Sequence, residues 1–429
     1  MNFLSKFALI TLFSLSSFSG KVLAYEYRSE AELGYQSALR VSDQEFTVSK
    51  LYFQYKGDSN LTGGSIETPF EAKISGSLRS WVDTQFSEPA GTARYTFERN
   101  TQNWGGEVEI RSLSLSLSQT LWKLQTGFQE IAWGETFGFQ IVDLVNPRDY
   151  SDPLILDPSW SRLPVFTLNG QLFLDRLTLQ GIFTPVPRNN KFPAFGSRFD
   201  PTLNDPVLQV QNPMAFKFSD FAKEAEFGMK ANYLFDSGLD LSAFYFHHWS
   251  RSLLYEFSSP STIAPVVEPV QSIGSTLSAS SGPWVLRNDS ILNWDQPLTG
   301  KTFGSVIRKR SQFQDILGAD FTTPQGWILG TQYHTEMNFY GDQNIYMNWA
   351  SAKVSAKFFS DKLEPEIFIF QGLGNMDQWV QPKLTWYPTG NWSASLRSDL
   401  IAGDPTPRRG YLGPLRNQNR LFLWLSCKI

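Results

Sequence analysis

The residues best suited to chemistry gather between positions 124 and 152, a stretch that reads LQTGFQEIAWGETFGFQIVDLVNPRDYSD. Charged side chains that converge on a water-filled passage select ions by sign. We therefore predict a pore constriction, with Gly134 permitting a sharp turn into it. Its charged members are Glu135, Asp143, Arg148, Asp149 and Asp152. The alternative is structural: Trp133 anchors the segment at an interface, and Arg148 pairs with an acidic neighbour to hold the segment in place.

Cations spread over the rest of the chain form a second candidate group. Each sits where polar residues alternate with apolar ones, so all of them would share the polar face of their strands. Together they would form a basic wall that raises the local concentration of anions. The members are Lys73, Arg79, Lys353, Lys357, Lys383, Arg397 and Arg420. The alternative is that these cations neutralise acidic side chains such as Glu226 and Asp399 around water.

Metal and covalent chemistry find little support in the sequence. The single cysteine, Cys427, excludes a disulfide within the chain and any cysteine-built metal site. His247 and His248 are adjacent, so on a strand they point to opposite faces and form no chelate. No metal and no cofactor is predicted. A hydrolase needs a Ser nucleophile and a His base held by a third polar group, and no short motif ties His248 or His334 to a serine.

The elements that position these residues are predicted to be strands. Apolar positions recur with a period of two, as where Phe70, Ala72 and Ile74 alternate with Glu71 and Lys73. No helical period extends over three turns. We predict about 16 strands, with 14 or 18 as alternatives. Their ranges are 30–41, 45–57, 68–83, 106–118, 121–132, 164–174, 175–184, 224–236, 239–251, 310–321, 326–338, 343–359, 362–371, 377–388, 390–402 and 418–429.

The connections between these strands indicate a membrane barrel. Long links, at 84–105, 133–163, 185–223 and 252–309, alternate with tight turns. In outer-membrane barrels the periplasmic turns are short and the extracellular loops are long. A soluble β-sandwich of this length would normally divide into domains joined by a linker, and none is evident. We predict an all-β protein, a single antiparallel transmembrane β-barrel over residues 25–429, in which the loop 134–163 narrows the pore.

The composition agrees with this prediction. Aromatic residues make up 15% of the chain and charged residues 18%, below the ~25% charged residues of soluble domains. Beyond the N-terminus no apolar run is long enough for a membrane-spanning helix. Trp327, Trp386 and Trp392 lie near tight turns, as in an interfacial aromatic girdle. The formal net charge of −4 disfavours nucleic acid as a partner.

Both ends of the chain carry export features. Residues 1–24 are predicted to be a signal peptide, with Lys6 before an apolar run and Val22-Leu23-Ala24 at the cleavage site. Apolar residues occupy every second position from Leu421 to Ile429. This ending resembles the C-terminal assembly signal of bacterial outer-membrane barrels, with Ile429 in place of the usual aromatic residue. The resemblance implies that the strand 418–429 is recognised by the barrel-assembly machinery of a Gram-negative bacterium.

The stretch that contains the predicted constriction also carries a family resemblance. Residues 127–135 have the form G-x-Q-x-x-x-W-G-E, and residues 146–149 the form N-P-x-D. In both elements the stretch resembles the large outer-membrane porins related to alginate-export porins. The match covers about 30 residues, so the family's substrate is not carried over.

From these features we predict an outer-membrane channel or transporter that passes a small solute, anionic or amphipathic, through its lumen. Its other partners would be outer-membrane lipid and lipopolysaccharide, which the basic run 306–310 would face. Two alternatives are an outer-membrane hydrolase resembling a phospholipase and a structural or adhesive barrel that works through its loops.

Overall fold

The computed structural model describes residues 22–429, except for 43, 45, 65–68, 84–94, 99–104, 156, 194–198, 200–208, 212, 253, 303, 342–343, 404–409 and 417. The predicted signal peptide therefore lies outside the described residues up to position 21. Most of the predicted link 84–105 and part of the link 185–223 also lie outside them.

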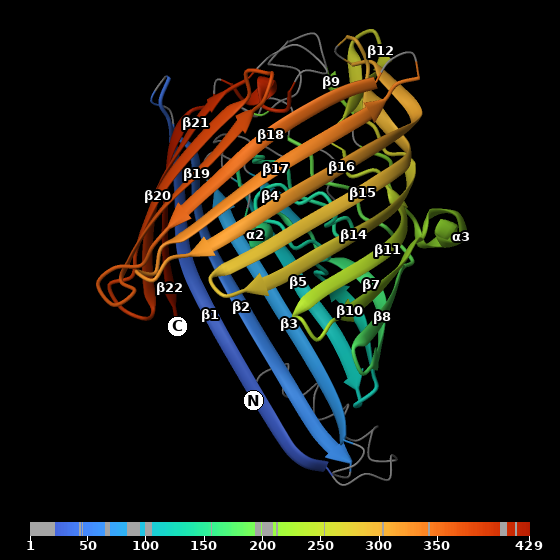
Figure 1. Ribbon diagram of the computed structural model, residues 1–429, viewed down its shortest axis with the longest axis vertical. Helices are drawn as coiled ribbons and strands as arrows, with labels where there is room; N and C mark the ends of the chain where they lie inside the picture. The colour runs from blue at the N-terminus through green and yellow to red at the C-terminus, as the bar shows by residue number, and fades with distance from the viewer. Residues whose placement is uncertain are drawn as a thin grey trace.

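The described residues form an antiparallel barrel of 18 strands, closed where β1 pairs with β22 (Figure 1). In ring order the strands are β1 (Val22–Arg40), β2 (Phe46–Gly64), β3 (Pro69–Asp83), β5 (Gly105–Ser118), β6 (Trp122–Gln129), β7 (Val165–Leu174), β8 (Leu177–Thr184), β10 (Glu226–Leu234), β11 (Leu239–Trp249), β14 (Pro269–Ser281), β15 (Trp284–Thr299), β16 (Val306–Thr322), β17 (Ile328–Phe339), β18 (Asn344–Ser355), β19 (Leu363–Gly372), β20 (Gln378–Trp386), β21 (Trp392–Ala402) and β22 (Arg420–Lys428).

The prediction of about 16 strands is wrong, because the predicted loop 252–309 contains the hairpin of β14 and β15. Serines dominate β14, and the outward positions of the hairpin include Ser275, Asn288 and Ser290. With polar residues on the lipid side as well as the lumen side, the hairpin lacks the alternation that marks a strand. The two missed strands form a pair. Each later link therefore stays on the side of the membrane that the prediction gave it.

The remaining elements are short. β4 (Tyr95–Glu98) pairs with the upper part of β5, and β9 (Gln209–Val210), β12 (Tyr255–Ser259) and β13 (Thr262–Pro265) form a small separate sheet at one end of the barrel (Figure 1). The helical segments are α2 (Pro158–Ser161), η1 (Phe218–Asp220), α3 (Phe221–Glu224) and η2 (Gly413–Leu415). No helix in the described part of the chain has the length and apolar content to span a membrane.

The two faces of the wall differ as the alternation predicts. On β7, Phe166 and Leu168 are exposed on the outside, whereas Thr167 and Asn169 are buried on the lumen side. Outward aromatic side chains cluster beside the short turns, among them Trp284, Trp327, Trp386 and Trp392. Amphipathic rings settle at the headgroup level of a membrane, so this end carries the predicted aromatic girdle.

A charge placed on the outer face tests this assignment of faces. We expect Leu168→Arg to lower the free energy of unfolding in lipid vesicles by about 2–4 kcal/mol, because a cation at mid-depth must leave water. Gln171→Arg, on the lumen face of the same strand, is expected to change it far less. Equal losses in urea titrations of both variants would contradict the assignment.

Candidate functional site

The segment between β6 and β7, residues 130–164, folds inside the barrel and is called the lumen loop below. It contacts successive parts of the wall. The backbone N–H groups of Glu135 and Thr136 donate to Asp289 on β15, and Phe139 packs against Phe370 on β19 with ring centroids 4.5 Å apart. Further along the loop, Asp152 pairs with Arg420 on β22 (2.6 Å). The lumen loop thus runs around the inside of the barrel.

Apolar packing fixes this path on two sides. Trp133 is 2% exposed and packs against Phe244 and Phe246 of β11. Across the lumen, Leu154 and the partly buried Phe137 join a cluster with aromatic residues of β18, β19 and β20. Burial of large apolar side chains is worth about 1.5–3 kcal/mol each, so the loop is docked on the wall.

The residues of the G-x-Q and N-P-x-D elements form the base of the lumen loop. Asn146 accepts a hydrogen bond from the Ile131 N–H (2.6 Å) and donates to the carbonyl groups of Gln129 (2.9 Å) and Leu163 (2.8 Å). One amide side chain therefore ties the start of the loop to its end. Gly127 has a φ of +121°, and a Cβ there would lie 2.2 Å from the Leu113 carbonyl oxygen.

The predicted constriction residues all lie on the lumen loop, but they bind different partners instead of forming one ring. Asp143, with a side chain 2% exposed, accepts from Arg148 (2.9 Å) and from Arg162 (2.6 Å). Asp149 pairs with Lys191 (3.1 Å). The pairing of Arg148 with Asp143 agrees with the structural alternative for this residue. The anchoring of Trp133 differs from that alternative, because its ring is buried in the lumen.

Glu130, Glu135 and Asp157 are the exposed acidic residues among those described on the lumen loop. Burial raises the pKa of the Glu135 carboxyl, an effect that nearby Lys230 opposes. Burial also raises the pKa of Glu130, against the pull of Arg111. Both carboxyl groups therefore titrate closer to neutral pH than free glutamate does.

Six members of the predicted basic wall face the lumen, and four of these share two acidic partners. Lys353 and Lys383 approach Glu366 at 3.1 and 3.9 Å. Arg397 and Arg420 both pair with Asp399, at 3.2 and 2.8 Å. Lys73 pairs with Asp58 (3.2 Å), and Arg79 faces the lumen loop. Lys357 lies beyond the end of β18, in an exposed turn, and is not part of the wall.

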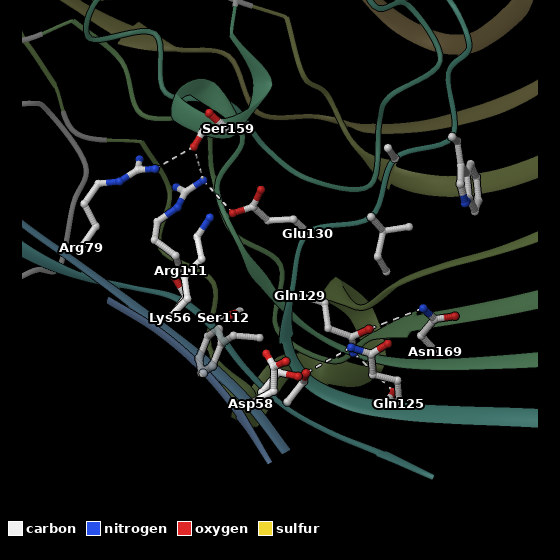
Figure 2. A pocket seen from close by; sticks show the side chains of 18 of the residues that line it. Lys56, Asp58, Arg79, Arg111, Ser112, Gln125, Gln129, Glu130, Ser159 and Asn169 are labelled. Atoms are coloured by element: carbon white, nitrogen blue, oxygen red, sulfur yellow. Dashed lines mark hydrogen bonds and ion pairs between the residues drawn. The ribbon is translucent and has the colours of Figure 1, made fainter. Parts of the chain in front are cut away.

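Below the lumen loop lies a polar cavity of about 880 Å³ (Figure 2). It is lined by amides and hydroxyls, by charged side chains and by three tryptophans. These include Lys56, Asp58, Arg79, Arg111, Ser112, Gln125, Gln129, Glu130, Trp133, Trp160, Asn169, Gln171, Gln180, Lys230 and Trp424. Such a mixed lining solvates polar solutes and offers faces for apolar parts.

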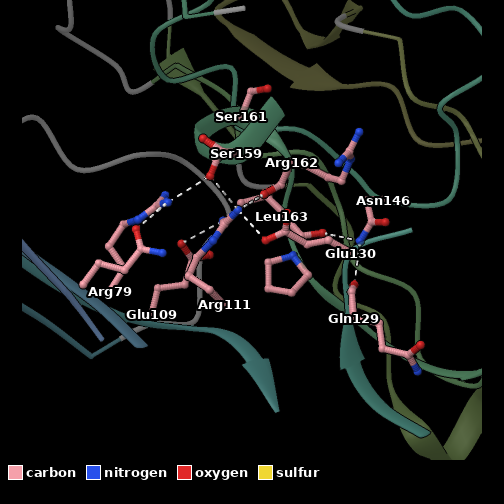
Figure 3. Close-up of polar contacts among 12 residues, drawn as sticks. Arg79, Glu109, Arg111, Gln129, Glu130, Asn146, Ser159, Ser161, Arg162 and Leu163 are labelled. Carbon is pink, nitrogen blue, oxygen red and sulfur yellow. Dashed lines mark hydrogen bonds and ion pairs between the residues drawn. The ribbon is translucent and has the colours of Figure 1, made fainter. Parts of the chain in front are cut away.

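Two arginines from neighbouring strands meet the lumen loop at the edge of this cavity (Figure 3). Arg79 on β3 and Arg111 on β5 both donate to the Ser159 carbonyl, at 2.9 and 3.1 Å. Arg111 also pairs with Glu130 (2.7 Å), and the Arg79 guanidinium stacks 3.9 Å from the Trp160 ring. Neither Arg111 nor Asp289 is among the predicted site residues. Arg111 could have been found from its alternation with outward Ile110, whereas Asp289 lies in β15, a strand that was not predicted.

A Ser–His contact of the kind that a hydrolase requires is present, between Ser272 Oγ and His248 Nε2 (2.8 Å). Ser272 is 0% exposed, so a substrate carbonyl has no access to its hydroxyl. His248 Nδ1 faces the adjacent Trp249 carbonyl (2.8 Å) instead of an acidic or amide side chain from another element. The contact is therefore a buried structural hydrogen bond and gives the hydrolase alternative no support.

Comparison with known proteins identifies the fold. No protein-family model matches the chain, and no curated protein matches it in sequence. Among solved structures it is similar to OccK8 (OprE) of Pseudomonas aeruginosa, with a TM-score of 0.55 and 11% identity over 96% of this chain and 99% of that chain. It is also similar to OccAB3 of Acinetobacter baumannii, with a TM-score of 0.51 and 9% identity over 95% and 100% of the two chains. The chain has the fold of large outer-membrane β-barrels.

Proposed function

We propose that the protein is a porin-like channel of the bacterial outer membrane that passes a small solute. The observation that carries this proposal is the polar cavity below the lumen loop. A barrel of this width can leave an aqueous passage, and here the loop follows the wall while polar groups line the space beside it. A purely structural barrel has no need of such a cavity.

The cavity lining supports a solute that is anionic or amphipathic. Arg79, Arg111 and Lys230 present cations, and Trp160 and Trp424 present apolar faces, in a setting rich in amides. Lys56 adds a fourth cation, and four acidic residues, Glu32, Asp58, Glu130 and Asp157, match the four cations in number. The combination favours a small molecule with both a charged group and an apolar or ring-shaped part.

The more specific relation to alginate-export porins is also a proposal. It rests on the elements at 127–135 and 146–149. Asn146 ties the two ends of the lumen loop together, and Trp133 donates to Gln180 on β8 (3.0 Å). We propose that barrels with these elements share this way of placing a loop in the lumen. Their substrate does not follow from it.

The partners predicted from the sequence remain proposals of the same kind. Outward apolar side chains on every wall support a lipid environment. Arg308 in the basic run 306–310 pairs with Glu256 and Glu268, so only part of that charge is available to lipopolysaccharide. The C-terminal strand, within residues 418–429, closes the ring against β1 and supports recognition by the assembly machinery.

Conductance through planar lipid bilayers tests the proposed function. We expect the purified protein to produce discrete current steps and to render vesicles permeable to small polar solutes. A folded barrel that inserts into bilayers but passes neither ions nor solutes would contradict it.

The basic wall should tune which ions pass. We expect Lys353→Gln combined with Lys383→Gln to shift the reversal potential in a salt gradient toward cation selectivity, because Glu366 then faces the lumen without its partners. The matched control is Lys357→Gln, in the exposed turn beyond β18. A shift toward anions, or the same shift in the control, would remove the wall as a selective element.

A further inference from the structure

The outer wall formed by β14 to β18 carries polar side chains where lipid chains would lie. Register aligns Ser275, Ser290, Asp315, Thr335 and Asn348 as direct neighbours across five consecutive strands. We call these five residues the outer polar row. Their chain neighbours Ile316, His334 and Trp349 are buried on the lumen side, so the row itself points outward.

The row lies at mid-depth. Asp315 is six residues from Phe321, which packs against Trp284 beside the short turns. At about 3.3 Å per residue and a tilt near 45°, this places Asp315 about 14 Å inside an apolar band of about 25 Å. The adjacent outward row toward the long loops is apolar: Ile273, Leu292, Phe313, Met337 and Tyr346. Lipid headgroups therefore do not reach the outer polar row.

On the opposite wall, outward positions at similar depth are apolar apart from Thr126 on β6. On β5, β6 and β7 they include Leu113, Leu115, Leu117, Leu124, Phe128, Phe166 and Leu168. Hydrocarbon cannot satisfy a carboxylate or an amide, so a polar group on a lipid-facing surface indicates a partner. The contrast between the two walls points to a specific contact on one of them.

Hydrogen bonds within the row leave complementary groups unused. Asp315 Oδ1 accepts from Ser290 and from Asn288 (3.0 Å), and Asn348 Oδ1 accepts from Thr335 (3.0 Å). Within the described residues, no hydrogen bond reaches Asp315 Oδ2 or leaves Asn348 Nδ2. An acceptor on β16 and a donor on β18 thus face the membrane on one surface.

We propose that this wall is the contact surface for a second copy of the same chain, with Asn348 of one copy donating to Asp315 of the other. Copies in one membrane share orientation and depth, so the outer polar row of one copy meets the row of its neighbour at the same level. The next outward row toward the short turns carries the exposed Leu317 and Tyr333, which would pack against the same residues of the second copy.

The test is the oligomeric state of the full chain in lipid nanodiscs, measured by native mass spectrometry. We expect the wild type to form a homo-oligomer. The combined variant Asp315→Leu and Asn348→Leu should fold, since apolar side chains suit this face, and its dissociation constant should rise at least tenfold. The matched control is Thr126→Leu, a lone polar position on the outer face of β6, which should assemble like the wild type.

Cross-linking provides a second readout that does not depend on loss of assembly. In a Cys427→Ser background, Asp315→Cys with Asn348→Cys should form a disulfide between copies on oxidation. The two positions lie two strands apart, about 9.6 Å, too far for a disulfide within one chain. A monomeric wild type, a double leucine variant that assembles as tightly as the wild type, or cross-linking no stronger than that of Leu168→Cys would each overturn the proposal.

Discussion

A chain in which residues 135–161 are replaced by a short Gly–Ser linker is expected to conduct several times more current than the wild type. The lumen loop occupies the interior from β15 to β22 and back to β5. Its removal leaves a wall of 18 strands, wide enough for an open aqueous channel. Single-channel recording in planar bilayers measures the change.

The strands do not depend on this loop for their pairing, so the shortened chain should remain a folded barrel that migrates differently before and after boiling. A matched control shortens the rim hairpin between β12 and β13, which lies outside the main sheet. Unchanged conductance after loop removal, or an equal rise in the control, would place the restriction elsewhere.

Asp143→Asn is expected to release the lumen loop from its docked position. The Asp143 carboxylate is the shared partner of Arg148 and Arg162, and all three side chains are largely buried. Removing one partner of a buried ion pair typically costs about 3–5 kcal/mol. We expect the open-channel current to become noisy or to switch between levels, and trypsin to cleave within the loop.

The control for this variant is Asp175→Asn, which removes a carboxylate from an exposed pair with Arg176 in the turn between β7 and β8. An exposed pair contributes at most about 1 kcal/mol, so the current should remain quiet. If the Asp143→Asn channel has a quiet open-channel current and its loop resists trypsin, the ion pairs do not hold the loop.

Sequence patterns predicted the barrel well wherever one face of a strand is apolar. They failed at β14 and β15, where the serine-rich β14 and outward Asn288 and Ser290 on β15 leave too few apolar residues on the outer face. The local physics that makes a strand visible in sequence is burial against lipid, and a face that meets something other than lipid loses that mark.

The candidate site was predictable in its location but not in its partners. Charged residues after Gly134 do fold into the lumen, yet Asp152 meets Arg420 at a sequence separation of 268 residues. Ring closure brings such residues together, and no local pattern encodes which strands a loop will cross. Lys357 was placed on the wall in error. Its alternation with apolar neighbours suits the lumen face, but β18 ends at Ser355 before reaching it.

The most direct test of the account asks whether the polar cavity lies on the conducting path. In a Cys427→Ser background, Gln171→Cys lines the cavity and Leu168→Cys faces outward on the same strand. A charged, water-soluble methanethiosulfonate reagent is added from either side during single-channel recording. The account predicts a stepwise change of current in Gln171→Cys from both sides and none in Leu168→Cys. Labelling of Gln171→Cys without any change in current would contradict it.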